Sequence, residues 1–423
     1  MITRIKGTHD ILPEEAAKWA RIEETARSVF IPFGFQEIRP PVMEWTELFA
    51  RGIGQATDIV EKEMYSFTDS KGRSISLRPE ATAGVLRAFL QNKLYAQSDE
   101  QKVFTFGPMF RHEQPQAGRF RQFHQIDAEV FGNPGPRVDV EIIVMLERFL
   151  AQAGVTDVKL IVNSLGCPHS DCRPAFREKL KQFLEARLDK LCPDCVRRTE
   201  LNPLRVLDCK VPSCREAVKG APSTLDHLCS ECRDHFKGLE EGLQTFDIDY
   251  TVEKRLVRGL DYYTRTIFEV ISSSLGGQDA VAGGGRYDLL AELLGGPSIP
   301  AIGFAVGLER LVTVSSLDVS PVRPDLYIAA LGEKPLDFAF ELANRLRLSG
   351  VTVELSHSQK SLKSQMRRAD KLQAAKVLII GDAEMESGRG ALRDMASKEQ
   401  SEVPLNAPAD ELKTLVLADR NQD

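Results

Sequence analysis

Residues 104–132 hold the segment that most constrains the fold of this chain (FTFGPMFRHEQPQAGRFRQFHQIDAEVFG). Its first part, FTFGPMFR, has the composition of a strand that ends at Arg111, and a polar turn containing Gly and Pro follows it. The second part, RQFHQIDAEVFG, alternates residue by residue, as a strand does because successive side chains point to opposite faces. The segment therefore predicts a β-hairpin.

The two faces of the second strand differ in chemistry. One face is mostly apolar, and the other combines an aromatic ring, an amide and two carboxylates. Polar faces are common in antiparallel sheets, so a solvated surface is one interpretation. Together with Arg111, these groups also suit a pocket that binds phosphate, a flat base and an amine. The apolar face holds His124, Ile126, Ala128 and Val130, and the polar face holds Phe123, Gln125, Asp127 and Glu129.

Length and charge limit the class of protein. A chain of 423 residues is long enough for two or three domains with substantial cores. The formal net charge of −6 argues against indiscriminate coating of nucleic acid, so contact with RNA requires a local basic surface. No apolar run reaches the roughly 20 residues of a membrane helix, and the N-terminus MITRIKGTHDILPEE lacks the apolar stretch of a signal peptide. We therefore expect a cytoplasmic protein with no membrane partner.

The distribution of apolar residues predicts two domains. Residues 14–31 and 138–153 have the spacing of amphipathic helices, and 158–166 is typical of a short strand. The segment SSLDVSPVRPD, which contains two prolines, is typical of a linker. Beyond it, alternating strands and helices predict a small α/β domain with a largely parallel sheet. We place the domains at 1–320 and 325–423, with a polar, helix-prone, cysteine-bearing insertion at about 166–242.

Four further strings, beginning at residues 77, 256, 281 and 301, contain groups suited to a charged ligand. In LRPEATAG, Glu80 and Thr82 can accept hydrogen bonds from an ammonium group, or Thr82 can simply cap the following helix. The tyrosine pair in LVRGLDYYTRTIFEV can be ordinary packing, and VAGGGRYD can be a glycine-rich turn. The arginine of AIGFAVGLERL can be a solvated helix charge. Each string alone therefore leaves a structural explanation open.

Together with the hairpin, and in their order along the chain, these strings resemble the class II aminoacyl-tRNA synthetases, in the form carried by bacterial histidyl-tRNA synthetases. The hairpin resembles motif 2 of that class, AIGFAVGLERL resembles motif 3, and GFQEIRPPVMEWTELF resembles motif 1, which forms the dimer interface. RGLDYY followed by TRT is close to a signature that other class II enzymes lack. The resemblance implies an α+β catalytic domain built on an antiparallel sheet, with a helical insertion, and a C-terminal α/β anticodon-binding domain.

The activity that the resemblance implies is the ligation of L-histidine to tRNA(His). ATP, a substrate used with Mg²⁺, and histidine form histidyl-adenylate with release of pyrophosphate, and histidine is then transferred to the 3′ end of the tRNA. The resemblance also implies a homodimer. The alternative is the non-catalytic, histidine-sensing regulatory subunit of ATP phosphoribosyltransferase. Such proteins share the fold but tend to lose the RGLDYY-type residues and the anticodon domain, and this chain keeps both.

The resemblance further implies roles for individual residues. Arg111 and Arg258 would be catalytic and flank the α-phosphate, because fixed guanidinium groups stabilise the charge that accumulates at phosphorus. The histidine site would comprise Glu80, Thr82, Arg111, Gln125, Glu129, Arg258, Tyr262, Tyr263 and Tyr287, with Glu129 and Tyr263 on the ring nitrogens. The ATP site would comprise Arg111, Glu113, Arg121, Phe123 and Arg310, with Phe123 stacked on adenine.

All eight cysteines lie in the insertion as four closely spaced pairs. In a cytosolic protein such pairs favour thiolate metal sites over disulfides. One four-cysteine zinc site could combine the two CxxC pairs, Cys192/Cys195 and Cys229/Cys232, and a second could combine the wider pairs, Cys167/Cys172 and Cys209/Cys214. Reduced thiols without metal remain the alternative. The family does not need zinc for its reaction, so such a metal would be structural.

The C-terminal domain contains one basic stretch, QKSLKSQMRRADK. At about 100° per residue, its basic residues fall on one side of a helix, and Leu362, Met366 and Ala369 face elsewhere. A solvated helix face is the common explanation. The stretch also resembles part of the family's anticodon-binding module, where phosphate contacts are expected. The residues predicted to contact tRNA are Lys360, Lys363, Arg367 and Lys371.

Overall fold

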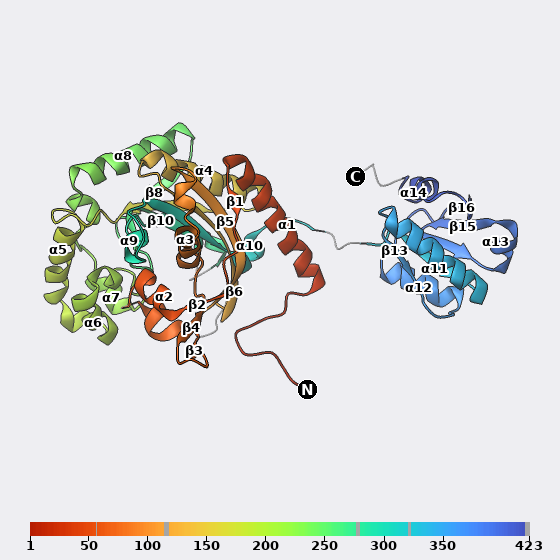
Figure 1. The fold of residues 1–423 in the computed structure, drawn as a ribbon, viewed down its shortest axis with the longest axis horizontal. Coiled ribbons are helices and arrows are strands. Elements are labelled where there is room, and N and C mark those ends of the chain that lie inside the picture. Colours follow the sequence, from red (N-terminus) through yellow and green to blue (C-terminus); the bar gives the residue numbers. More distant parts are fainter. Residues whose placement is uncertain (56, 114–117, 276–279, 320–322, 419–423) are drawn as a thin grey trace. The chain divides into compact units, whose positions relative to one another are not determined.

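The computed structural model describes residues 1–55, 57–113, 118–275, 280–319 and 323–418. The chain divides into two compact units, Met1–Val319 and Ser320–Asp423, and each is described by itself (Figure 1). The predicted hairpin turn at 114–117 and the centre of the predicted linker at 320–322 lie outside the described residues. Within the described ranges, every helix is too short or too polar to span a lipid bilayer.

The first unit is built on an eight-stranded sheet in the order β1-β5-β6-β11-β10-β9-β7-β8. The edge pairs β1–β5 and β7–β8 are parallel, and all other neighbours are antiparallel. The antiparallel character agrees with the sequence prediction. The strands are β1 (Gln36–Glu37), β5 (Gln101–Phe110), β6 (Gln122–Phe131), β7 (Lys159–Ser164), β8 (Tyr250–Val252), β9 (Thr264–Ile271), β10 (Ala280–Arg286) and β11 (Ala301–Gly307).

One face of this sheet is covered by long helices. The apolar face of β6 joins Phe30, Phe149 and Leu239 in a single hydrophobic core, because the alternation of β6 turns Ile126, Ala128 and Val130 toward those helices. The helices that supply this core are α1 (Pro13–Phe30), α4 (Pro136–Gln152) and α8 (Ser230–Thr245), and the short helix α10 (Leu308–Val314) adds Leu308 and Leu311.

The opposite side of the unit carries a second core and a small sheet. Helix α3 contributes Val85 and Phe89 to this core, next to Tyr262, Tyr263 and Tyr287. The three-stranded sheet has the order β2-β4-β3 and is antiparallel throughout. The strands of this sheet are β2 (Met43–Trp45), β3 (Ser66–Thr68) and β4 (Ser74–Leu77). The helices on this side are α2 (Thr46–Ile53), α3 (Thr82–Gln91) and α9 (Leu290–Leu293).

The cysteine-bearing segment between β7 and β8 is helical. Figure 1 shows α5, α6 and α7 gathered beside the eight-stranded sheet in yellow-green, followed by α8 in green. Phe176, Leu180 and Leu184 of α5 join the second core, so the segment packs on the unit rather than forming a separate body. Its helices are α5 (Arg173–Glu185), α6 (Pro193–Leu201), α7 (Pro212–Ala217) and α8 (Ser230–Thr245).

The second unit has a five-stranded sheet in the order β13-β12-β14-β15-β16. The first three strands are parallel, as the alternating pattern predicts, but β14, β15 and β16 are antiparallel. The expectation of a largely parallel sheet is therefore wrong for its last part, because the short helix α13 leads from β14 into an antiparallel β15, and β16 then pairs antiparallel with β15. The elements are β12 (Leu326–Ala330), α11 (Glu333–Leu348), β13 (Val353–Leu355), α12 (Leu362–Lys371), β14 (Lys376–Ile380), α13 (Asp382–Ser387), β15 (Arg389–Asp394), β16 (Gln400–Pro404) and α14 (Ala409–Leu417).

Candidate active site

A cavity of about 780 Å³ opens on the sheet of the first unit. Its floor is a cross-strand row in which Asp127 of β6 pairs with Ala305 of β11, Ala305 with Gly283 of β10, and Gly283 with Glu269 of β9. The two central residues of this row are small, so the sheet surface is hollow between the two carboxyl groups. The glycine-rich string of β10 therefore creates space for a ligand, as only residues with little or no side chain can.

Most of the predicted histidine and ATP residues surround this cavity. They come from α3, the hairpin β5–β6, the segment before β9, the end of β10 and α10. Glu129 and Arg121 are the two predicted residues that do not line it. The predicted residues that do are Glu80, Thr82, Arg111, Glu113, Phe123, Gln125, Arg258, Tyr262, Tyr263, Tyr287 and Arg310.

Glu80 and Thr82 stand at the start of α3, and Glu80 caps it. The Glu80 carboxylate accepts hydrogen bonds from the backbone N–H groups of Thr82 (2.8 Å) and Ala83 (3.0 Å). Sequence reasoning considered Thr82 as the cap, and that assignment is wrong. Burial raises the pKa of Glu80, although these hydrogen bonds oppose the rise. The site thus holds a desolvated carboxylate at a helix N-terminus.

Glu129 lies one layer behind the cavity wall. Its Oε1 accepts a hydrogen bond of 2.7 Å from the Thr82 hydroxyl, and its Oε2 accepts one from the Tyr287 hydroxyl. Burial raises the pKa of Glu129 well above its usual range, and the two hydroxyl donors only partly offset this. Both Thr82 and Tyr287 line the cavity, so Glu129 fixes the orientation of two hydroxyl groups there.

Asp127 was not among the predicted site residues, but it lines the cavity and is 1% exposed. Burial raises the pKa of its carboxyl group well above the usual range, and the nearby Glu80 raises it further, while Arg78 and Arg111 oppose the rise. Its Oδ2 has no hydrogen-bond partner among the described residues. The sequence contained the signal, because Asp127 alternates with Gln125 and Glu129 on the polar face of β6.

Arg258 lies over the glycine floor. Its guanidinium group forms an ion pair with Glu269 and lies 5.8 Å from the ring centroid of Tyr263. Burial alone would lower the pKa of Arg258, but the negative charge of Glu269 raises it, so the side chain stays cationic. Glu269, which sequence reasoning missed, belongs to TIFEV, where its charge within an apolar strand was the available signal.

Arg111 and Phe123 face each other across the hairpin. The Arg111 guanidinium lies 5.1 Å from the ring centroid of Phe123, and its Nε donates a hydrogen bond of 2.8 Å to the Pro79 carbonyl. Glu113 pairs with Arg119 at 2.9 Å and is 3.9 Å from Arg111. Arg121 hydrogen-bonds through its backbone to Arg111 and Gly7, at the base of the hairpin turn.

Arg310 enters the cavity from α10, at the first turn after β11. Its Nη1 donates a hydrogen bond of 2.8 Å to the Ala280 carbonyl, and its Nε donates one of 3.2 Å to the Gly118 carbonyl. The preceding Glu309 accepts hydrogen bonds from the backbone and ring of His124. These contacts hold α10 against the hairpin, so the arginines of two distant strings share one cavity.

The basic stretch of the second unit forms the outer face of α12. Gln365 and Ala369 are buried, and Gln365 anchors the helix by donating a hydrogen bond of 2.7 Å to the Ala330 carbonyl. Helix α12 begins at Leu362, after the Ser361 cap, so the expectation that Lys360 belongs to the helical stripe is wrong. All four predicted tRNA contacts are exposed: Lys360, Lys363, Arg367 and Lys371.

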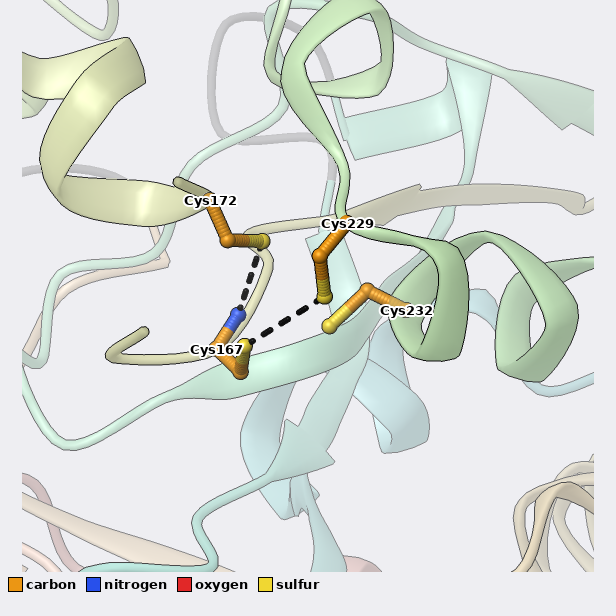
Figure 2. A group of neighbouring side chains, drawn as sticks. All are labelled: Cys167, Cys172, Cys229 and Cys232. Carbon is orange, nitrogen blue, oxygen red and sulfur yellow. Dashed lines mark hydrogen bonds between the residues drawn. The ribbon is translucent and has the colours of Figure 1, made fainter. Parts of the chain in front are cut away.

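The cysteines form two groups of four, but not the expected ones. One group holds Cys167, Cys172, Cys229 and Cys232, and the other holds Cys192, Cys195, Cys209 and Cys214 (Figure 2 shows the first). The predicted combination of Cys192 and Cys195 with Cys229 and Cys232 is wrong. Each group instead joins one CxxC pair to one wider pair. Spacing identifies pairs but carries no information on which pairs meet in space.

Comparisons with known proteins agree with this architecture. The family described as histidyl-tRNA synthetase matches residues 7–311, and the anticodon-binding domain family matches residues 325–415. A histidine–tRNA ligase of Desulfatibacillum aliphaticivorans is 53% identical over 98% of this chain and 99% of its own length. That of Geobacter metallireducens is 53% identical over 97% and 98%. The crystal structure of apo S. aureus histidyl-tRNA synthetase has a TM-score of 0.82 and 34% identity, and it covers 98% of this chain and 100% of its own.

The antiparallel sheet, its cavity and the separate C-terminal sheet unit define an enzyme of the aminoacyl-tRNA synthetase class. Within that class, the chain belongs to the histidyl-tRNA synthetase family.

Proposed function

We propose that this protein ligates L-histidine to tRNA(His) through a histidyl-adenylate. The observation that carries the proposal is that one cavity is lined by two kinds of group. Glu80, Asp127 and three tyrosines supply acidic and phenolic groups, and the arginines 111, 258 and 310 supply guanidinium groups. The acidic and phenolic groups suit an ammonium group and an imidazole. The guanidinium groups suit a triphosphate and a carboxylate, because they bind such oxyanions through charge-assisted hydrogen bonds.

In the first step, a histidine carboxylate oxygen forms a bond to the α-phosphorus of ATP, and the bond from that phosphorus to the pyrophosphate oxygen breaks. Arg111 and Arg258 flank the α-phosphate and stabilise the charge that develops there. Both are fixed before substrate binds, Arg111 by the Pro79 carbonyl and Arg258 by Glu269. In the second step, a hydroxyl of the terminal ribose of the tRNA attacks the carbonyl carbon, and AMP leaves.

ATP binding uses the hairpin and α10. Phe123 stacks on adenine, Glu113 orients the nucleotide, and Arg310 binds the γ-phosphate. Arg121, which does not line the cavity, supports the hairpin through its backbone hydrogen bond to Arg111 instead of contacting the nucleotide as the sequence predicted. Mg²⁺ bound to the phosphates would neutralise part of their charge and would need only one or two protein carboxylates. Glu113, Glu269 and Glu309 line the same cavity as Arg310, and their carboxylates would have the chemistry to hold the ion.

Recognition of histidine uses the opposite part of the cavity. Glu80, Thr82 and Gln125 bind the α-amino group, Tyr263 binds a ring nitrogen, and Tyr262 and Tyr287 enclose the ring. Glu129, which does not line the cavity, acts through the hydroxyl groups of Thr82 and Tyr287 instead of contacting the ring as the sequence predicted. The buried Asp127 supports this, because its Oδ2 has no hydrogen-bond partner among the described residues and a ligand without N–H donors leaves it unpaired. Discrimination by such a site reaches about 10⁴-fold or more.

The exposed basic face of α12 supports contact with the tRNA backbone. An apolar face of the small sheet supports a homodimer, because Trp45, Ile75 and Phe67 form a cross-strand row in which Trp45 is 47% and Phe67 45% exposed. The eight free thiols are consistent with the cytoplasm.

The experiment is pyrophosphate exchange into ATP by the purified protein, with each amino acid supplied in turn. We expect exchange with histidine alone. Arg258→Ala should abolish it while the far-ultraviolet circular dichroism is unchanged, and Arg21→Ala, which removes an exposed surface arginine of α1, should leave it intact. Exchange driven by another amino acid contradicts the proposed specificity, and no exchange at all favours a regulatory protein.

A further inference from the structure

The two cysteine groups bring together residues that are far apart in the sequence. The first group joins the end of β7 to the start of α8, and its four side chains point toward one another (Figure 2). The second group lies within the stretch from the N-cap of α6 to the middle of α7. In each group, every sulfur lies within 4.8 Å of the other three. Nothing in the proposed reaction uses these thiols.

The sulfur separations match a metal site rather than a covalent bond. Cys167 Sγ and Cys229 Sγ are 3.7 Å apart, and Cys192 Sγ and Cys209 Sγ are 4.0 Å apart. Four sulfurs arranged tetrahedrally at about 2.3 Å from a zinc ion are about 3.8 Å from one another. A disulfide requires about 2.05 Å. The observed separations therefore correspond to the edges of a zinc tetrathiolate.

The local backbone is arranged to compensate for thiolate charge. Each CxxC pair straddles a helix start, with Cys192 and Cys229 at the N-cap positions of α6 and α8 and their partners Cys195 and Cys232 in the first turn. The free N–H groups and the positive end of the helix dipole at such a start favour anionic sulfur.

Backbone N–H groups also bond directly to the wider pairs. The N–H of Cys167 donates to Cys172 Sγ at 3.4 Å, and that of Cys192 donates to Cys214 Sγ at 3.1 Å. Donors of this kind surround a metal site as its outer layer, where they fix the ligands and offset the net negative charge of a tetrathiolate. Both groups share this feature although their sequences differ.

We propose that each group binds one Zn²⁺ as a closed, structural tetrathiolate site. Binding turns four S–H groups into four S–Zn bonds and releases the protons to solvent, with no change of oxidation state. The first ion ties both ends of the inserted segment to the catalytic sheet. The second ties together the stretch from Cys192 to Cys214, whose helices α6 (Pro193–Leu201) and α7 (Pro212–Ala217) are short. A small segment with a limited core commonly needs such a cross-link.

The second site also connects to the cavity. Cys209 lines the cavity together with the adjacent Asp208 and Lys210. Between α6 and Cys209, Arg205 donates a hydrogen bond of 3.0 Å to the backbone carbonyl of Arg258. An ion at the second site therefore stiffens a wall that supports Arg258, without contacting the reacting atoms.

The test begins with the metal content of the full-length protein, purified without added metal and dialysed against metal-free buffer. We expect two zinc ions per chain by inductively coupled plasma mass spectrometry. Titration of the wild-type thiols with a mercurial reagent should release one zinc ion for every four thiols that react. Thiols that titrate without releasing zinc, iron in place of zinc, or disulfides in the purified protein would each overturn the proposal.

Paired variants test the grouping and serve as controls for each other. Cys192→Ser with Cys209→Ser changes one group only and should retain one zinc ion. Cys192→Ser with Cys229→Ser changes both groups and should retain none. The reverse result would support the alternative in which the CxxC pairs combine, and would refute the grouping in the structure. If a variant fails to fold, the wild-type ratio of released zinc to reacted thiols still decides whether the sites exist.

Discussion

Gly283 offers a way to move the Arg258 side chain without changing it. A Cβ atom at Gly283 would lie 2.5 Å from Nη1, 2.6 Å from Nη2 and 2.7 Å from Cζ of Arg258. Ordinary contacts between such atoms are about 3.5–4.0 Å, so Gly283→Ala must displace the guanidinium group by about 1 Å. The obstructed atoms are the far end of a long side chain, so the displacement does not require the backbone to move.

This geometry predicts a loss of activity that is much larger than the loss of stability. Gly283 lies in β10 with a backbone conformation open to alanine, and Gly→Ala at a compatible site changes stability by only about 0.4–1 kcal/mol. Misplacing a catalytic group by about 1 Å costs about 10²-fold in rate. We therefore expect kcat/KM for histidine-dependent pyrophosphate exchange to fall about 10²-fold, or about 2.7 kcal/mol at 1.36 kcal/mol per factor of ten.

The assay compares Gly283→Ala with wild-type protein and with Gly84→Ala, in exchange and in thermal unfolding. At Gly84 a Cβ atom would meet nothing closer than 3.8 Å, so this variant controls for a general glycine-to-alanine effect. Full exchange activity in Gly283→Ala would refute the inference that the position of Arg258 limits catalysis. A loss of activity matched by an equally large loss of stability would attribute the effect to folding instead.

Three other outcomes follow from the same site and the second unit. Asp127→Asn should raise the free energy of unfolding at pH 8 by about 1–3 kcal/mol, measured by chemical denaturation. Burial raises the pKa of the Asp127 carboxyl group, so the contribution of this group to stability is present below its ordinary pKa and is lost as pH rises through the raised pKa. The variant should lack that pH dependence. Tyr287→Phe leaves the buried Glu129 Oε2 without its hydrogen-bond donor and should lower the free energy of unfolding by about 1–3 kcal/mol. The control Tyr250→Phe removes only a long hydrogen bond of 3.5 Å to Glu240 and should change the free energy of unfolding little. The double variant Lys363→Ala with Arg367→Ala should raise KM for tRNA and reduce the dependence of tRNA binding on salt by about one ion per lost phosphate contact. Pyrophosphate exchange should be unchanged, and Lys334→Ala in α11 is the control.

The elements with strong periodicity were predictable from the sequence. The pairing of β5 with β6 runs from Gln101↔Phe131 to Phe110↔Gln122, and the apolar residues of β6 face the helices as the alternation requires. The expected helix at 14–31 is α1 (Pro13–Phe30), and the expected helix at 138–153 is α4 (Pro136–Gln152). These elements are decided by local pattern, because one face of each must be buried.

Features that depend on which segments meet in space were not predictable from spacing. The grouping of the cysteines is set by the paths of α5 to α8, and the cap of α3 is Glu80 because its carboxylate reaches the N–H groups of Thr82 and Ala83. The ion pair of Arg258 with Glu269 requires β9 and the segment before it to fold back on each other. The sequence predicted most of the side chains that line the cavity, but not the partners that position them.

The carboxyl groups of the cavity explain how this site can be both selective and costly to maintain. Glu80, Asp127 and Glu129 are all buried close together, and burial raises the pKa of each, so the empty site holds protons more strongly than the unfolded chain does. A bound ammonium group adds positive charge to that of Arg78 and Arg111 beside this cluster, and so lowers those pKa values. Asp127, whose Oδ2 has no hydrogen-bond partner among the described residues, therefore favours a ligand that carries positive charge and N–H donors, because a ligand without them leaves this carboxyl group desolvated and unpaired.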